Sequence, residues 1–139
     1  MKSAYPKAMR HKRIFTKRGY RLKPFRSSLR NVTRTAREWG FPFALRVEPE
    51  LLRNYTPLQI CDDEGYYLVG QITLLIDAVL NGSLPCRLES QGKYLAFRLR
   101  FAAQHRRRDT AETMKLWVLI GPCDSNRPVV CLTRTEPLF

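Results

Sequence analysis

The chain has little of what most catalytic sites use. Among its 139 residues there are two histidines, His11 and His105, and four cysteines that form no C-x-x-C pair. Structural zinc sites normally need closer ligand pairs, and neither histidine has an evident acid–base partner nearby in the sequence. The sequence also contains no G-x-x-x-x-G-K-[ST] or G-x-G-x-x-G phosphate loop. We therefore expect a protein that is not an enzyme and that uses no metal and no cofactor.

Long apolar runs are missing as well. No stretch approaches the ~20 apolar residues that a membrane-crossing helix needs. The basic start of the chain is not followed by an apolar segment, so it does not have the pattern of a secretory signal. Its Arg-rich, acid-poor composition has the character of a transit peptide, but Pro6, Gly19 and Pro24 interrupt any amphipathic helix. We expect the protein to be located inside a cell, in the cytoplasm or the nucleus, where the four cysteines stay reduced as half-buried apolar side chains.

Negative charge is nearly absent from the first quarter of the chain. Residues 1–38 contain 13 Lys and Arg and one acid, a net of +12, whereas residues 39–139 have a net charge of only +1. A block of one sign repels itself and cannot be buried in a core. The sequence therefore predicts a basic N-terminal arm, residues 1–38, followed by a compact domain, residues 39–139. A tail that only keeps the protein soluble is the alternative.

Basic residues of the arm and of later segments are the candidates for anion contacts. Four aromatic rings stand among the charges of the arm, where rings can stack on bases, lie at a lipid interface or dock the arm onto the domain. We predict nucleic-acid or anion binding by Arg10, Lys12, Arg13, Lys17, Arg18, Arg21, Lys23, Arg26, Arg30, Arg98, Arg100, Arg106, Arg107 and Arg108.

Before residue 61, the apolar residues form only short periodic segments. A helix is predicted over residues 28–39, because Ser27-Ser28 can cap its start and Gly40 can end it. Apolar and polar residues then alternate over residues 43–47, which predicts a half-buried strand. We expect residues 50–57 to be irregular and residues 58–61 to form a short second strand.

The most regular helical pattern follows the acidic run Asp62-Asp63-Glu64. Negative charge is favourable at a helix start, and Asn81-Gly82 is a suitable end. One apolar face repeats at helical spacing between these two signals. Its members are Leu68, Ile72, Leu75, Ile76 and Val79.

The clearest strand pattern covers residues 94–101. Apolar residues alternate there with Tyr94, Ala96, Arg98 and Arg100, which indicates an antiparallel sheet with one wet, basic face. His105 to Asp109 is expected to be a charged, exposed turn. Residues 116–120 and 129–132 are two further strands, joined by a loop rich in Gly, Pro, Asp and Asn. The predicted fold class is α+β, a small and mainly antiparallel sheet with one main amphipathic helix, preceded by a flexible basic arm.

Short motifs accompany the principal helix and the last predicted hairpin. The segment from Cys61 to Tyr66 has the form C-x-x-x-G-Y immediately before the helix, and Cys123 and Cys131 form C-x7-C near Trp117. This order over residues 57–133 resembles the matrix proteins of rhabdoviruses, particularly those of the lyssavirus type. The chain is shorter than those proteins and lacks their P-P-x-Y motif, with only a loose Y-x-x-L form at residues 55–58.

The resemblance implies a small viral structural protein. Such a protein would self-associate beneath a lipid envelope, contact the anionic membrane and condense the ribonucleoprotein. We would then expect it to be located in the virion as well. A polybasic segment gains about 1 kcal/mol per Lys or Arg at an anionic surface, which suffices for peripheral binding without an inserted helix.

Two other functions use the same residues. The arm could bind RNA or DNA along its phosphates, as in a ribosome-associated, capsid or silencing-suppressor protein, and this hypothesis needs no family resemblance. An enzyme acting on a polyanionic substrate is the third hypothesis, and it lacks a set of catalytic residues.

Overall fold

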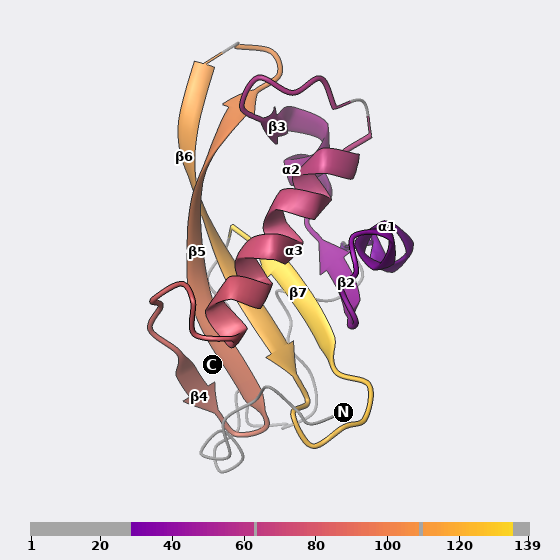
Figure 1. The fold of residues 1–139 in the computed structure, drawn as a ribbon, viewed down its shortest axis with the longest axis vertical. Helices are drawn as coiled ribbons and strands as arrows, with labels where there is room; N and C mark the ends of the chain where they lie inside the picture. The colour runs from indigo at the N-terminus through magenta and orange to yellow at the C-terminus, as the bar shows by residue number, and fades with distance from the viewer. Residues whose placement is uncertain (1–28, 63, 109, 135–139) are drawn as a thin grey trace.

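The structure, a computed structural model, describes residues 29–62, 64–108 and 110–134 (Figure 1). Eight predicted anion contacts, from Arg10 to Arg26, lie outside these residues. The elements along the chain are β1 (Arg30–Asn31), α1 (Thr33–Glu38), β2 (Ala44–Val47), α2 (Pro49–Asn54), β3 (Tyr55–Pro57), α3 (Tyr66–Leu80), β4 (Glu89–Gln91), β5 (Tyr94–His105), β6 (Thr110–Gly121) and β7 (Val129–Thr133).

The strands form one curled sheet in the order β1-β2-β7-β6-β5-β3. Every pairing is antiparallel except that between β2 and β7, which is parallel. The edge of β5 away from β6 pairs with β4 at one end and with β3 at the other. The hairpin of β5 and β6 is the longest element of the sheet, and α3 crosses in front of it in Figure 1.

The principal helix is confirmed as α3. Leu68, Ile72 and Ile76 are almost completely buried against the sheet. At the start of the helix, the two carboxylate oxygens of Asp62 accept the backbone N–H groups of Tyr67 and Leu68, at 3.2 and 2.9 Å. The acid therefore satisfies two of the amides that an α-helix leaves without partners at its N-terminus.

The α+β class is confirmed, with α3 as the main helix and a mainly antiparallel sheet. The predicted strands at 94–101, 116–120 and 129–132 are present as β5, β6 and β7, and the strand at 43–47 is present as β2. Both strands of the hairpin are longer than predicted, because Ala102 to His105 pair with Thr110 to Thr113 in continuous register.

Three predictions for the first half of the chain were wrong. The helix over residues 28–39 is only α1, because Arg30 and Asn31 pair with β2 instead. Residues 50–57 are not irregular: Pro49 starts α2, where its fixed φ and missing N–H cost nothing. Residues 58–61 do not form a strand, and Leu58 and Ile60 are exposed.

Residues before position 39 contribute to the packed domain. Val32 and Ala36 belong to the main core, and the backbone N–H of Val32 donates to Leu45 O at 2.9 Å. The predicted boundary at residue 38 assigned this segment to the arm. In the described part of the chain, the packed region already includes β1 and α1.

His105 is buried, at 6% exposure, and not on the surface as predicted. Its ring packs edge-on to Tyr55, with centroids 5.1 Å apart. Its Nδ1 accepts the backbone N–H of Arg107 at 3.1 Å, so the imidazole fixes the start of the charged turn. His105 is the last residue of β5, and its side chain has a structural role in the turn that follows.

Candidate anion-binding face

The sheet has two faces of different chemistry. Side chains alternate along each strand, so residues such as Leu95, Phe97 and Leu99 enter the main core beneath α3. On the opposite face, Ala96, Trp117 and Leu119 form a second, smaller apolar cluster. We call this second surface the outer face, and it consists of the outward side chains of β2, β7, β6 and β5.

Four basic residues project from the outer face. By strand alternation, Arg46 on β2, Arg98 and Arg100 on β5, and Lys115 on β6 share the face with Trp117, and all four are exposed. Arg100 and Lys115 are direct cross-strand partners. Within the described chain, none of these four residues forms an ion pair with a carboxylate. The result is a positive surface built from three strands.

Arg98 lies over the indole ring of Trp117, its direct partner across β5 and β6. The guanidinium carbon is 4.8 Å from the ring centroid, within the range of a cation–π contact. Trp117 is 7% exposed, so its ring is covered by its neighbours, and Arg98 contributes to that cover. A base or a phosphate approaching this face would therefore meet a preoriented donor group.

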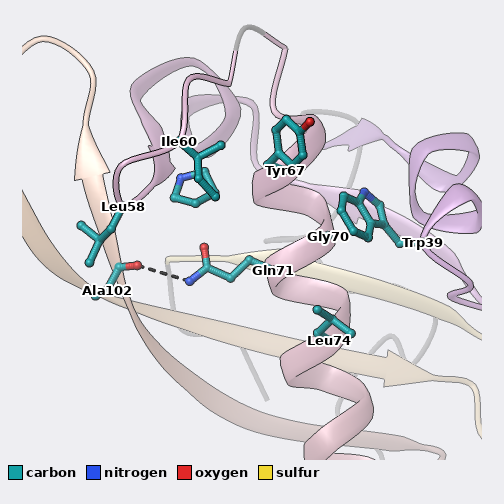
Figure 2. A pocket seen from close by; sticks show the side chains of 9 residues that line it. Trp39, Leu58, Ile60, Tyr67, Gly70, Gln71, Leu74 and Ala102 are labelled. Atoms are coloured by element: carbon teal, nitrogen blue, oxygen red, sulfur yellow. Dashed lines mark hydrogen bonds between the residues drawn. The ribbon is translucent and has the colours of Figure 1, made fainter.

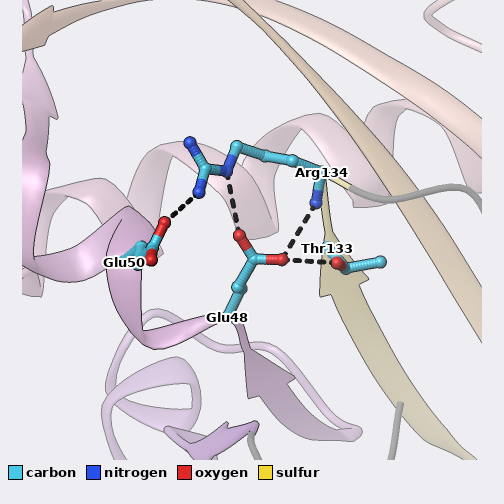
Figure 3. A network of polar contacts seen from close by, with 4 residues as sticks. All are labelled: Glu48, Glu50, Thr133 and Arg134. Carbon is cyan, nitrogen blue, oxygen red and sulfur yellow. Dashed lines mark hydrogen bonds and ion pairs between the residues drawn. The ribbon is translucent and has the colours of Figure 1, made fainter. Parts of the chain in front are cut away.

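Two carboxylates lie at the margins of the outer face. Glu89 on β4 is the direct partner of Ala96, which places its side chain on the same face. Glu48 follows β2, and residues at the end of β7 bind its carboxylate (Figure 3). Thr133 Oγ1 donates to its Oε2 at 2.6 Å and Arg134 Nε donates to its Oε1 at 2.9 Å, while Arg134 Nη2 pairs with Glu50.

This network lowers the pKa of Glu48. Burial alone would raise the pKa of Glu48, but the hydrogen bonds from Thr133 and Arg134 and the charge of Arg134 outweigh it and lower the pKa. The neighbouring carboxylates also raise the pKa of Arg134, although burial opposes this. Glu48 therefore stays ionised at neutral pH, and Arg134, which it shares with Glu50, compensates part of its charge.

Cys131 and Tyr94 lie beside the Trp117 cluster and carry no charge at neutral pH. Burial raises the pKa of Cys131 to about 11, and burial followed by nearby negative groups raises the pKa of Tyr94. Cys86 and Cys123 are half-buried as predicted, whereas Cys61 is exposed. No described cysteine forms a disulfide, and the described residues contain no cluster of three side chains able to hold a metal ion.

The structure brings together only some of the predicted contacts. Arg98 and Arg100 share the outer face, while Arg30 is exposed on β1 at the sheet edge. Arg107 and Arg108 are exposed in the turn between β5 and β6, at the far end of the hairpin from Arg98.

Arg106 differs from its two neighbours in that turn. It is half-buried, and its Nε and Nη2 have no hydrogen-bond partner. Its backbone N–H donates to Asn54 O at 2.8 Å, which ties the turn to the end of α2. This guanidinium is held against the domain and does not extend the outer face.

Sequence reasoning missed Arg46 and Lys115 as members of the site. Lys115 lies two residues from Thr113 and from Trp117, so it shares their face of the strand, a signal that would have placed it beside Arg100 once the hairpin register was known. Arg46 reaches the same face only through the parallel pairing of β2 with β7, which no local pattern indicates.

Comparison with known proteins adds no relative: no protein-family model matches the chain, and neither a curated protein nor a solved structure is significantly similar to it. The resemblance to rhabdovirus matrix proteins therefore stays a prediction. In the part of the chain that the structure describes, no helix is long and apolar enough to cross a membrane.

Proposed function

We propose that this protein is a non-enzymatic, matrix-like structural protein whose basic arm and outer face bind the phosphates of a nucleic acid or ribonucleoprotein. Self-association of the domain belongs to the same proposal, because a structural protein of this size covers a polyanion only as many copies. An RNA- or DNA-binding protein without a structural role would use the same residues on the same ligand.

The pair of Arg100 and Lys115 carries the proposal. Directly opposed like charges destabilise an antiparallel pair, typically by ~0.2–1 kcal/mol, and these two residues are cross-strand partners without a carboxylate between them. A phosphate lying between the two side chains would remove this repulsion. Arg98 on Trp117 adds a fixed donor on the same surface, and Arg46 extends it by two strands.

The test is RNA binding as a function of salt. We expect the double variant Arg100→Ala/Lys115→Ala to weaken binding to single- and double-stranded RNA, and to reduce the slope of log K against log salt by about 0.7 to 0.9 for each contact removed. The matched control is Arg53→Ala/Arg87→Ala, which removes the same charge from exposed residues of α2 and of the segment before β4. Equal losses in the two double variants would show that only net charge matters.

The arm is expected to contribute more than the outer face. Replacing Arg10, Lys12, Arg13, Lys17 and Arg18 with Ala should flatten the salt dependence further and weaken binding to all RNA sequences alike. An isotherm that does not respond to salt would contradict the electrostatic basis of the proposal.

An anionic membrane is a second candidate partner, favoured by the concentration of 13 basic residues in positions 1–38. Flotation with phosphatidylserine-containing vesicles distinguishes the two partners. A matrix-like protein should float with these vesicles and lose flotation when the arm is neutralised. A protein dedicated to nucleic acid should stay at the bottom of the gradient in both forms.

A further inference from the structure

The side of the molecule that carries α3 has an apolar groove. Its volume is about 430 Å³, and it lies between α3 and the segment after β3, with its floor at β5 (Figure 2). The side chains that form its walls are mostly apolar. They include Trp39, Leu58, Ile60, Tyr67, Gln71 and Leu74.

Large apolar side chains are unusually exposed around this groove. Leu58, Ile60 and Tyr67 are 41–45% exposed and Leu74 is 60% exposed. Within the described chain, five of the six exposed large apolar residues lie between positions 58 and 74, and Leu88 is the sixth. A contiguous exposed apolar surface of this kind marks an interaction site more often than isolated exposed residues do.

The groove is preformed. Gly70 on α3 leaves room for the indole ring of Trp39, because a Cβ at position 70 would overlap that ring. The indole N–H of Trp39 donates to Tyr66 O at 3.0 Å, and its ring lies 6.1 Å from that of Tyr67. These contacts fix one wall without a ligand, so a partner would not need to order it on binding.

One polar group in the groove still lacks a partner. Gln71 Nε2 donates to Ala102 O at 3.3 Å, which leaves the side-chain oxygen free (Figure 2). That oxygen is buried and accepts no hydrogen bond. A buried acceptor without a donor is unfavourable, so an occupant that offers an N–H group would improve the site.

The charge around the groove identifies the kind of occupant. Residues 54–86, which supply α3 and most of the groove, contain no Lys, Arg or His but four acids: Asp62, Asp63, Glu64 and Asp77. Asp77 lies one helical turn after Leu74, on the same side of α3. The neighbouring cavity, which shares Ile60, is lined by one acid, Asp62, and by two basic residues, His105 and Arg106. In a chain with a net charge of +13, residues 54–86 thus form a long segment with no basic side chain of its own, which favours a cationic occupant.

We propose that the groove binds a cationic, amphipathic peptide segment of a partner protein. The apolar side chains of the segment would cover Leu58, Ile60 and Leu74, its Lys or Arg residues would lie near Glu64 and Asp77, and an N–H group would reach Gln71. The protein would thus bind a polyanion on its outer face and a cationic protein on the α3 side at the same time.

The experiment measures binding of a short fluorescent peptide of leucine and lysine, with amphipathic spacing, to the full chain. We expect Leu74→Ser and Ile60→Ser each to weaken its binding about tenfold, which corresponds to ~1.4 kcal/mol, because each removes one apolar contact. Leu88→Ser is the matched control, since Leu88 is 38% exposed and does not line the groove. It should leave the affinity unchanged.

Charge is tested with a second peptide in which glutamate replaces lysine. This peptide can bind the basic arm, but its affinity should not respond to Leu74→Ser. If the lysine peptide does not bind, or binds the Leu74→Ser and Ile60→Ser variants as tightly as the unchanged protein, the proposal is wrong.

Two other occupants give different results. If a second copy fills the groove, Leu74→Ser changes the sedimentation coefficient of the protein alone, which overturns the proposal. If residues 1–28 of the chain fill it, neutralising the arm tightens peptide binding even in about 0.5 M salt, where long-range repulsion is screened, and this also overturns it.

Discussion

The outer face and the α3 side use opposite surfaces of the same strands. On β5, Arg98 and Arg100 point to the outer face, whereas Leu99 and Phe101 point into the core beneath α3. The outer face is basic and its small cluster is covered by Arg98, while the α3 side is apolar and acidic around its groove. Under the two proposals, this small domain would keep ligands of opposite charge apart, with one sheet between them.

The largest expected effect separates the buried and exposed faces of α3. Ile76 is completely buried and Leu74 is 60% exposed. We expect Ile76→Asp to lower the free energy of unfolding by about 4 kcal/mol, because it places a charge in the core without a partner. Leu74→Asp adds the same charge to the same helix and should cost less than about 1 kcal/mol. Urea unfolding measures both; equal losses would mean that the groove wall is part of the core.

An intermediate effect concerns the carboxylate at the margin of the outer face. Because the folded pKa of Glu48 is lowered, its contribution to stability is present above the unfolded value of 4.5 and is lost as the pH falls through the folded pKa. We expect Glu48→Gln to cost about 1 kcal/mol at pH 7 and to cost progressively less as the pH falls below 4.5.

The control for Glu48→Gln is Glu50→Gln, which removes the other carboxylate that Arg134 contacts. The side chain of Glu50 is 51% exposed against 20% for Glu48, so its loss should matter less. Thermal unfolding between pH 3 and pH 7 measures both variants. A difference between the unchanged protein and Glu48→Gln that persists at low pH would contradict the assigned protonation.

The smallest effect is one of reactivity and leaves stability unchanged. Cys61, on the α3 side, is exposed, whereas Cys131, on the outer face, is partly buried and has its pKa raised to about 11. We expect iodoacetamide at pH 8 to modify Cys61 first and Cys131 slowly, because the thiolate is the reactive form. Mass spectrometry of digested protein gives the order; rapid modification of Cys131 would show that the outer face opens in solution.

Sequence patterns predicted the elements whose signals are local. The helical repeat of α3 and the alternation in β5 are each contained in a single segment. The alternation in β5 was also enough to assign Arg98 and Arg100 to a solvent-exposed face. Leu58 and Ile60 misled the prediction, because an exposed apolar run has the composition of a strand. Membership of Lys115 and Arg46 in the outer face depends on register between strands, which a single segment does not contain.

The groove could not be predicted for the same reason. Its fixed wall depends on Trp39 meeting Gly70, two residues that are distant in the sequence and have no shared motif. The absence of basic residues between positions 54 and 86 was visible in the sequence. Its relevance to a binding site depends on the structure, which places that segment on the side opposite Arg98 and Lys115.

The parallel pairing of β2 with β7 has a consequence for synthesis of the chain. Thr133 binds Glu48 across 85 residues, and the register of Ala44 with Val129 has the same separation. Contacts of such long range are slow to form, since the intervening loop must close first. We expect β1, α1 and β2 to leave the ribosome before β7 and to wait for it, because the partners of β2 on β7 are made 85 residues later. Until then one edge of β2 stays unpaired. Under the proposed function, a polyanion bound to the preceding basic residues would reach this segment before its final partner does.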